Sequence, residues 1–174
     1  MDKGLNHNYR LRLIKPCDNA QVKNVVVDVM SSYNCVGQGF SSADSELDNM
    51  HEAYSGDRFE FYVVVDAQDK VYGCSGIAPL IGAADNICEL RKMYFYPSIR
   101  GLGLGSQMLE LLLGRAKYFG FKQCYLETVA AMNEARVIYD KFGFRPIPSS
   151  IGATGHNGCD NYICLLYTSP SPRD

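Results

Sequence analysis

The stretch Arg100-Gly101-Leu102-Gly103-Leu104-Gly105 joins a predicted strand to a predicted helix. Glycines let backbone N–H groups approach a ligand without obstruction from side chains. The first N–H groups of a helix have no partner within the helix, and the helix dipole is positive at that end. The stretch therefore predicts an anion site suited to a pyrophosphate, to which Arg100 adds a charge-assisted contact.

The segments on both sides of this turn have clear patterns. Residues 87–96 predict a long strand, with two faces that alternate along the chain. One face carries Glu89, Arg91, Met93 and Phe95, and the other carries Cys88, Leu90, Lys92 and Tyr94. The helix after the turn ends at Gly120, a residue typical of a C-cap. Its predicted buried side consists of Leu104, Met108, Leu111, Leu112, Ala116 and Phe119.

Periodicity places the remaining elements. Strands are predicted at 9–14, 59–65, 71–79, 123–128, 144–147 and 161–166. Helical spacing predicts helices at 22–30, 47–54 and 132–142, the first of them after a capping box at 18–21. Gly73 and Gly76 indicate a bulge or a close backbone approach in their strand.

The order of these elements, β-α-α-β-β-β-α-β-α-β-β, predicts one mixed α/β (α+β) domain with a mainly antiparallel sheet. The domain is predicted to span residues 1–166. Residues 167–174 are rich in Ser and Pro, and we expect them to form a non-native or disordered tail outside the fold.

Composition excludes several classes of protein. A net charge of -2, a pI near 5.9 and interspersed charges leave no basic surface for nucleic acid or an anionic membrane. No stretch approaches the roughly 20 apolar residues that cross a bilayer, and the first nine residues lack the apolar run of a signal peptide. Seven cysteines without a Cys-x-x-Cys pair suit a reducing compartment. We therefore expect a cytoplasmic protein.

Three kinds of phosphate-binding turn compete for the glycine-rich stretch. A P-loop needs Gly-Lys-Ser/Thr, but Ser106 and Gln107 follow Gly105. A Rossmann fingerprint needs G-x-G-x-x-G, and the third glycine falls one place early. Arg-x-x-Gly-x-Gly after a strand, matched by Arg100, Gly103 and Gly105, resembles the acetyl-CoA-binding signature of the GNAT acetyltransferase superfamily. In element order the resemblance covers residues 9–166, and its motifs lie between Glu89 and Phe144.

This resemblance implies the GNAT fold, with about seven strands splayed between the fourth and fifth and flanked by four helices. It implies acetyl-CoA as the acetyl donor, bound by strand backbone through its pantetheine arm and by turn amides through its pyrophosphate. The implied donor-binding residues are Met93, Tyr94, Phe95, Arg100, Gly101, Leu102, Gly103, Leu104, Gly105 and Ser106. The sequence departs from the family at Met132, where many members have an asparagine; Asn133 is shifted by one.

Transfer to an amine needs a neutral nucleophile and a protonated leaving thiol. The resemblance implies Glu89 as the base and Tyr139 as the acid towards the CoA thiolate. A surface carboxylate and a core aromatic are the alternatives for these two residues. His156, in the glycine-rich loop 149–160, is a candidate for the acceptor pocket or for the base, and Tyr33 is a candidate for the acceptor pocket.

The expected activity is that of an acyltransferase that moves acetyl from acetyl-CoA directly to a primary amine of a small molecule, an amino acid or a peptide. The alternative is an acyl-CoA-binding or sensor module without chemistry. Acidic residues at 44, 46, 48 and 52 favour a cationic acceptor or, alternatively, serve as helix caps. No metal, nucleic acid or membrane partner is expected, and a homodimer through the last strand pair rests on analogy.

Overall fold

A seven-stranded mixed sheet forms the centre of the protein, of which a computed structural model describes residues 8–129 and 132–166. Its strand order is β1-β2-β3-β4-β5-β7-β6, and every neighbouring pair is antiparallel except β4 and β5. The strands are β1 (Arg10–Leu13), β2 (Glu60–Val65), β3 (Val71–Pro79), β4 (Ile87–Phe95), β5 (Gln123–Thr128), β6 (Arg145–Ile147) and β7 (Asn161–Leu166). The predicted mixed, mainly antiparallel sheet is confirmed.

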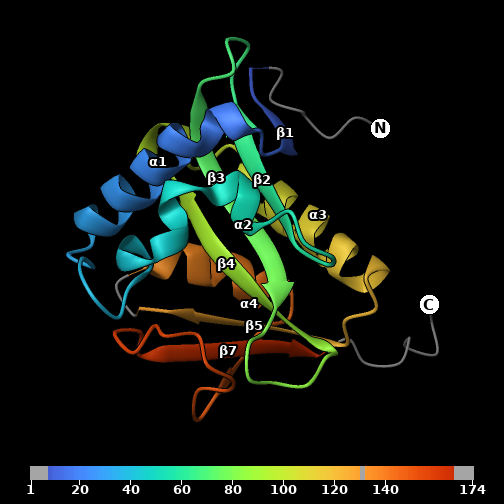
Figure 1. The fold of residues 1–174 in the computed structure, drawn as a ribbon. Coiled ribbons are helices and arrows are strands. Elements are labelled where there is room, and N and C mark those ends of the chain that lie inside the picture. The colour runs from blue at the N-terminus through green and yellow to red at the C-terminus, as the bar shows by residue number, and fades with distance from the viewer. Residues whose placement is uncertain (1–7, 130–131, 167–174) are drawn as a thin grey trace.

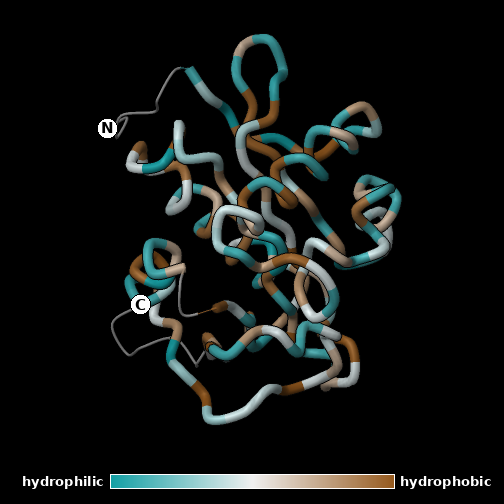
Figure 2. Tube along the Cα trace, turned by 90° about the vertical axis from the view of Figure 1, so that its left-hand side faces the viewer, coloured by the Kyte–Doolittle hydropathy of each residue, from teal (hydrophilic) through white to brown (hydrophobic). Residues whose placement is uncertain are grey.

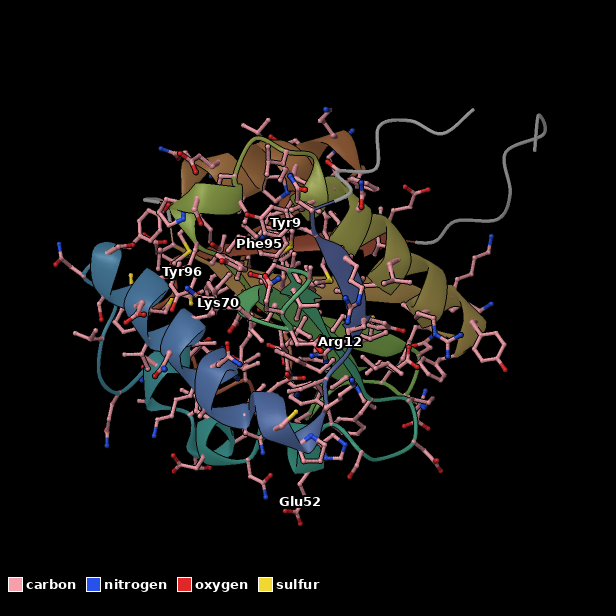
Figure 3. The ribbon with its side chains drawn as sticks, turned by 90° about the horizontal axis from the view of Figure 1, so that it is seen from above. Tyr9, Arg12, Glu52, Lys70, Phe95 and Tyr96 are labelled. Atoms are coloured by element: carbon pink, nitrogen blue, oxygen red, sulfur yellow. The ribbon has the colours of Figure 1, made fainter. Side chains whose placement is uncertain are left out.

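Helices cover both faces of this sheet (Figures 1 and 3). α1 (Asn19–Ser32) and the single turn α2 (Met50–Ala53) lie on one face, and α3 (Leu104–Tyr118) and α4 (Asn133–Lys141) on the other. Each face has its own apolar core, one around Val25, Val26 and Met50 and one around Leu112 and Phe144. The loop between β2 and β3 projects from the top and is hydrophilic, whereas the strands below it are hydrophobic (Figure 2).

Several predicted local features differ in the structure. The predicted helix at 47–54 is a 3-10 turn, η3 (Ser45–Asp48), followed by α2. The capping box at 18–21 is wrong, because the Asp18 carboxylate accepts hydrogen bonds from the Arg12 guanidinium and the Lys15 N–H instead. In α3, Leu109 and Leu113 are buried while Leu111 and Phe119 are half-buried. The predicted tail, 167–174, lies outside the described residues.

A β-bulge interrupts the middle of β4. Cys74 of β3 pairs with Tyr94, and Gly76 pairs with Arg91, so that Ser75 alone faces two residues of β4, Lys92 and Met93. Lys92 has a φ of 53°, a left-handed conformation that is uncommon outside glycine. The strict alternation predicted for this strand is therefore wrong beyond Arg91.

The bulge moves the end of β4 to new faces of the sheet. Met93 and Phe95 pack on the α3 and α4 side, together with Cys88 and Leu90. Tyr94 packs on the α1 side. An extra residue reverses every later side chain, because side chains alternate along a strand.

β4 and β5 pair only over their first residues. The parallel register joins Ile87–Glu89 to Gln123–Tyr125 and goes no further, although β4 continues to Phe95 and β5 to Thr128. Beyond this short ladder the two strands diverge (Figure 1). The splay predicted between the fourth and fifth strands is confirmed.

The glycines of β3 are sites of close approach, and one of them tests the packing directly. A Cβ on Gly76 would lie 2.5 Å from the Phe61 ring and 2.7 Å from the Glu60 carbonyl oxygen. We expect Gly76→Ala to lower the free energy of unfolding by about 1–3 kcal/mol, measured by urea denaturation. Gly114→Ala, in the exposed middle of α3 with nothing near its Cβ, is the control and should raise it by about 0.5–1 kcal/mol. Equal effects of the two changes would contradict this packing.

Candidate functional site

The glycine-rich turn connects the end of β4 to the start of α3. Gly101 and Gly103 both have φ of 79°, which side chains rarely adopt, and Gly103 is the N-cap of α3. A Cβ at either position would meet nothing within 4 Å, so the backbone here is open. Gly105 is packed differently, with the Ile138 Cδ1 atom of α4 2.9 Å from its ideal Cβ position. The turn therefore presents the first N–H groups of a fifteen-residue helix in an unobstructed setting.

Arg100 holds this turn to the strand before it. Its Nε and Nη2 atoms donate to the Phe95 carbonyl oxygen at 3.0 and 2.8 Å. Its Nη1 atom also lies 3.6 Å from the Glu134 carboxylate. The structure thus gives Arg100 a local partner at the end of β4, and its predicted contact with an anion stays a prediction.

A first pocket lies where β4 and β5 part, and we call it the cleft. It contains about 480 Å³ of empty space, open solvent included. Met93 and Tyr94 of β4, Tyr139 of α4 and Met132 before α4 all line it. The position at which the resemblance to the family implies an asparagine is thus occupied by a buried methionine, and Asn133 is exposed. The other lining residues are Met30, Ser41, Leu90, Lys92, Leu126, Glu127, Thr128, Val129, Ala135 and Cys159.

Tyr139 is a buried phenol at this cleft. Its side chain is 5% exposed and packs against the Phe144 ring, with 5.7 Å between centroids. Burial raises the pKa of the Tyr139 hydroxyl well above its ordinary value of about 10, with a smaller contribution from Cys124. The hydroxyl is therefore protonated at neutral pH, the state in which it can donate a proton.

A second pocket, which we call the charged pocket, lies beside the cleft. It contains about 520 Å³ of empty space, open solvent included, and Lys92 lines both pockets. It brings together two predicted site residues, Glu89 and His156. Tyr33 lines neither pocket; it is half-buried at the end of α1 against the core on that side. The other lining residues are Asp44, Ser45, Glu46, Ile81, Arg91 and Thr154.

Glu89 is almost fully buried, with 3% of its surface exposed. Burial raises the pKa of its carboxyl above the ordinary value, and the charge and hydrogen bond of Arg91 oppose that shift. The Arg91 Nε atom lies 2.6 Å from the carboxylate. A carboxyl with a raised pKa beside a pocket is suited to accept a proton.

Lys92 is the buried cation at the junction of the two pockets. Its ammonium, 1% exposed, donates to Asp44 at 2.7 Å and to Glu46. Asp44 in turn lies 2.9 Å from the Nε2 atom of His156, and the Tyr54 hydroxyl donates to Glu46. Asp44 and Glu46 thus neutralise internal cations. Asp44 stands at the N-cap position of η3, but its side chain makes no capping hydrogen bond. Their acidity gives no independent support for a cationic acceptor.

The pairing of Lys92 with Asp44 and Glu46 was not predicted from the sequence. Regular alternation placed Lys92 with Cys88 and Leu90, which are buried on the opposite face of the sheet. A lysine among apolar residues in the middle of a strand was the available signal, because a buried cation needs carboxylate partners. Those partners are 46 and 48 residues away along the chain.

Comparison with known proteins assigns this chain to a family. The family model described as "Acetyltransferase (GNAT) domain" matches residues 57–146. A protein of Escherichia coli strain K12, named "Uncharacterized N-acetyltransferase YjgM", is 40% identical over 144 residues, which cover 82% of this chain and 86% of that protein. The chain belongs to the GNAT acetyltransferase family.

Other relatives agree with this assignment. "Uncharacterized N-acetyltransferase C1271.07c" of Schizosaccharomyces pombe is 27% identical over 120 residues, covering 64% of this chain and 72% of that one. The solved structure of a GNAT-family acetyltransferase from Staphylococcus aureus Mu50 has a TM-score of 0.76 at 16% identity, covering 92% of this chain and 99% of that one. YncA from Salmonella typhimurium, solved "with its cofactor Acetyl-CoA", has a TM-score of 0.71 at 16% identity and covers 96% and 98%. The two structures show that the fold is shared.

Two absences apply to the described part of this N-acetyltransferase. Residues 8–129 and 132–166 hold no cluster of three or more His, Cys, Asp or Glu side chains placed to bind a metal ion. In the same ranges, none of the helices combines the length and the apolar character needed to span a bilayer.

Removal of the buried cation tests the charge network of this GNAT domain. Lys92→Met leaves Asp44 and Glu46 without their shared partner, and we expect the free energy of unfolding to fall by up to about 3 kcal/mol, because both carboxylates are only 24–25% exposed. Lys23→Met, which breaks an exposed pair with Asp48, is the matched control and should cost less than about 1 kcal/mol. The triple change K92M/D44N/E46Q should recover part of the loss. Equal losses in the two single variants would contradict the network.

Proposed function

We propose that this protein transfers the acetyl group of acetyl-CoA directly to a primary amine, through the cleft and the charged pocket. The observation that supports this most strongly is that the cleft and the charged pocket share Lys92 as a lining residue, on the strand that precedes the open N-terminus of α3. One pocket can receive the thioester and the other the amine. The overall reaction is R–NH₃⁺ + CH₃CO–SCoA → R–NH–COCH₃ + HS–CoA + H⁺.

The proposed donor site combines the turn with the end of β4. The backbone N–H groups of the turn would bind the pyrophosphate, since no side chain obstructs them at Gly101 and Gly103. The unpaired edge of β4 beyond Glu89 would bind the amide groups of the pantetheine arm, because β5 does not use it. The residues assigned to the donor site are Met93, Tyr94, Phe95, Arg100, Gly101, Leu102, Gly103, Leu104, Gly105 and Ser106.

Tyr139 is the proposed general acid. Its hydroxyl is protonated, buried and on the wall of the cleft, so it can donate a proton to the sulfur as the carbon–sulfur bond breaks. The second amine proton of the tetrahedral intermediate then restores the phenol. The alternative is that Tyr139 is only an aromatic residue of the core, with no catalytic role.

Glu89 is the proposed general base for the acceptor amine. An alkyl ammonium with a pKa of about 10 is not a nucleophile, so its first proton must leave before attack. Glu89 lines the charged pocket, and its raised pKa favours proton uptake. The proposed acceptor is a small molecule, an amino acid or a peptide terminus. The cytoplasmic location and the homodimer expected from the sequence stay predictions.

Substitution of the phenol tests this function. With acetyl-CoA and a panel of ethanolamine, putrescine, L-methionine and trialanine, we expect thiol release from the wild-type protein with at least one amine. Tyr139→Phe should lower kcat by about 10²-fold or more and leave the KM for acetyl-CoA nearly unchanged. Tyr118→Phe, at a tyrosine that is 75% exposed, is the control. An unchanged kcat in Tyr139→Phe would remove the acid role, and tight acetyl-CoA binding without turnover of any amine would favour a binding module.

A further inference from the structure

Each turnover leaves a proton inside the protein. By the balance given above, one proton is released for every amine acetylated. If Glu89 accepts it, the proton rests on a carboxyl that is 3% exposed and paired with Arg91. Direct contact with bulk water is therefore small, and the next turnover requires that another group carry the proton away.

His156 is placed to carry that proton. It lines the charged pocket together with Glu89, whose charge raises the pKa of His156. Burial lowers the pKa of His156, but the hydrogen bond and charge of Asp44, aided by Glu89, raise it above the ordinary value of about 6.5. Histidine is the side chain that gains and loses a proton most readily near neutral pH.

Asp44 fixes the orientation of the imidazole. Both of its carboxylate oxygens lie near Nε2 of His156, at 2.9 and 3.2 Å. With Nε2 donating to Asp44, Nδ1 is the ring nitrogen that is available for exchange. Lys92 and His156 lower the pKa of Asp44 against the opposing effect of burial, so that this carboxylate stays ionised and stabilises the imidazolium form.

The loop that carries His156 is fixed on both sides of the histidine. Before it, the Ala153 N–H donates to the Ile81 carbonyl at 2.7 Å, and the Thr154 hydroxyl accepts from the His156 N–H at 3.1 Å. After it, the Gly158 N–H donates to the Gly39 carbonyl at 3.0 Å. A side chain on a loop anchored in this way keeps one position, as a relay requires.

We propose that His156, oriented by Asp44, relays the acceptor's proton from Glu89 to solvent; this proposal rests on the proposed function. The amine proton moves to a Glu89 carboxylate oxygen. It then passes to Nδ1 of neutral His156, directly or through water in the charged pocket, and gives an imidazolium. The imidazolium loses the proton to buffer or water, and both groups return to their starting states.

The charged groups around His156 set the sign of its pH dependence. Those that line the charged pocket with His156 are Asp44 and Glu46 at η3 and Glu89, Arg91 and Lys92 of β4. Glu127 of β5 accepts from the hydroxyl of Thr154, two residues before His156. Asp44 and Glu89 raise the pKa of His156, and Lys92 lowers it. Because the relay needs neutral His156, kcat should rise with pH through the titration of this group. Asp44→Asn removes the largest raising partner and should shift that rise to lower pH.

Buffer rescue separates a relay from a structural role. In dilute buffer we expect His156→Ala to lower kcat tenfold or more while the KM values change little, with the most reactive amine of the panel as acceptor. Added imidazole should restore kcat in proportion to its concentration, because it takes over proton transfer. His51→Ala, at a half-buried histidine in α2 outside both pockets, is the matched control and should show neither loss nor rescue.

A second measurement does not depend on turnover. NMR titration of the His156 ring in the free protein should shift to lower pH in Asp44→Asn and, by less, in Glu89→Gln. Two results would overturn the relay and leave the acetyltransferase proposal intact. One is a His156 pKa that is the same in Glu89→Gln as in the wild-type protein. The other is a His156→Ala variant with wild-type kcat in dilute buffer. A folded wild-type protein that turns over no amine would instead contradict the proposed function, and the NMR titration would still decide whether the network exists.

Discussion

The extra residue in β4 at Lys92 is the constraint on which the rest of the site depends. A β-bulge bends its strand and increases the local twist. Here it follows the short parallel ladder between β4 and β5, and the two strands separate beyond that ladder. The same bulge turns Met93 and Phe95 towards α3 and α4 and Tyr94 towards α1. One irregularity therefore decides which side chains at the end of β4 face the cleft and which face the opposite core.

Lys92 also explains why segments far apart in the chain meet at one place. A buried ammonium is unfavourable without partners, and the loops around Asp44 and Glu46 supply them. Asp44 extends the chain of contacts to His156 in the loop before β7. Glu89 and Arg91 form a second pair along the same strand. The charged pocket is thus assembled by pairing charges, whereas the glycine-rich turn and the end of β4 leave backbone groups unpaired by β5.

Local sequence was enough for most of the fold and for the position of the glycine-rich turn before α3. The strands predicted at 71–79, 123–128 and 161–166 agree with β3, β5 and β7 to the residue, and Gly103 stands at the N-cap of α3. These features depend on alternation and on glycine, which act over a few residues. The exposed face of α3 was harder to predict from the sequence. Leucines at 109, 111, 112 and 113 point in several directions around the helix, so periodicity does not identify one buried side.

The contacts of the charged pocket could not be predicted in this way. Nothing in the regular alternation of residues 87–96 signals that Lys92 is a bulge residue, since bulges depend on pairing with β3. Asp44 and His156 are 112 residues apart in the chain, so their contact is a product of tertiary structure. Tyr33 is half-buried at the end of α1 and lines neither pocket, and its role in the acceptor pocket stays a prediction.

We propose that the parted end of β4 and the glycine-rich turn together hold the acetyl donor. Hydrogen exchange of backbone amides, with and without acetyl-CoA, is the most direct test of this donor site. We expect slower exchange at Met93 to Phe95 and at Gly101 to Ser106 with acetyl-CoA, and no change with NADH or ATP. Unchanged exchange in both segments at saturating acetyl-CoA, or equal protection by NADH, would contradict this donor site.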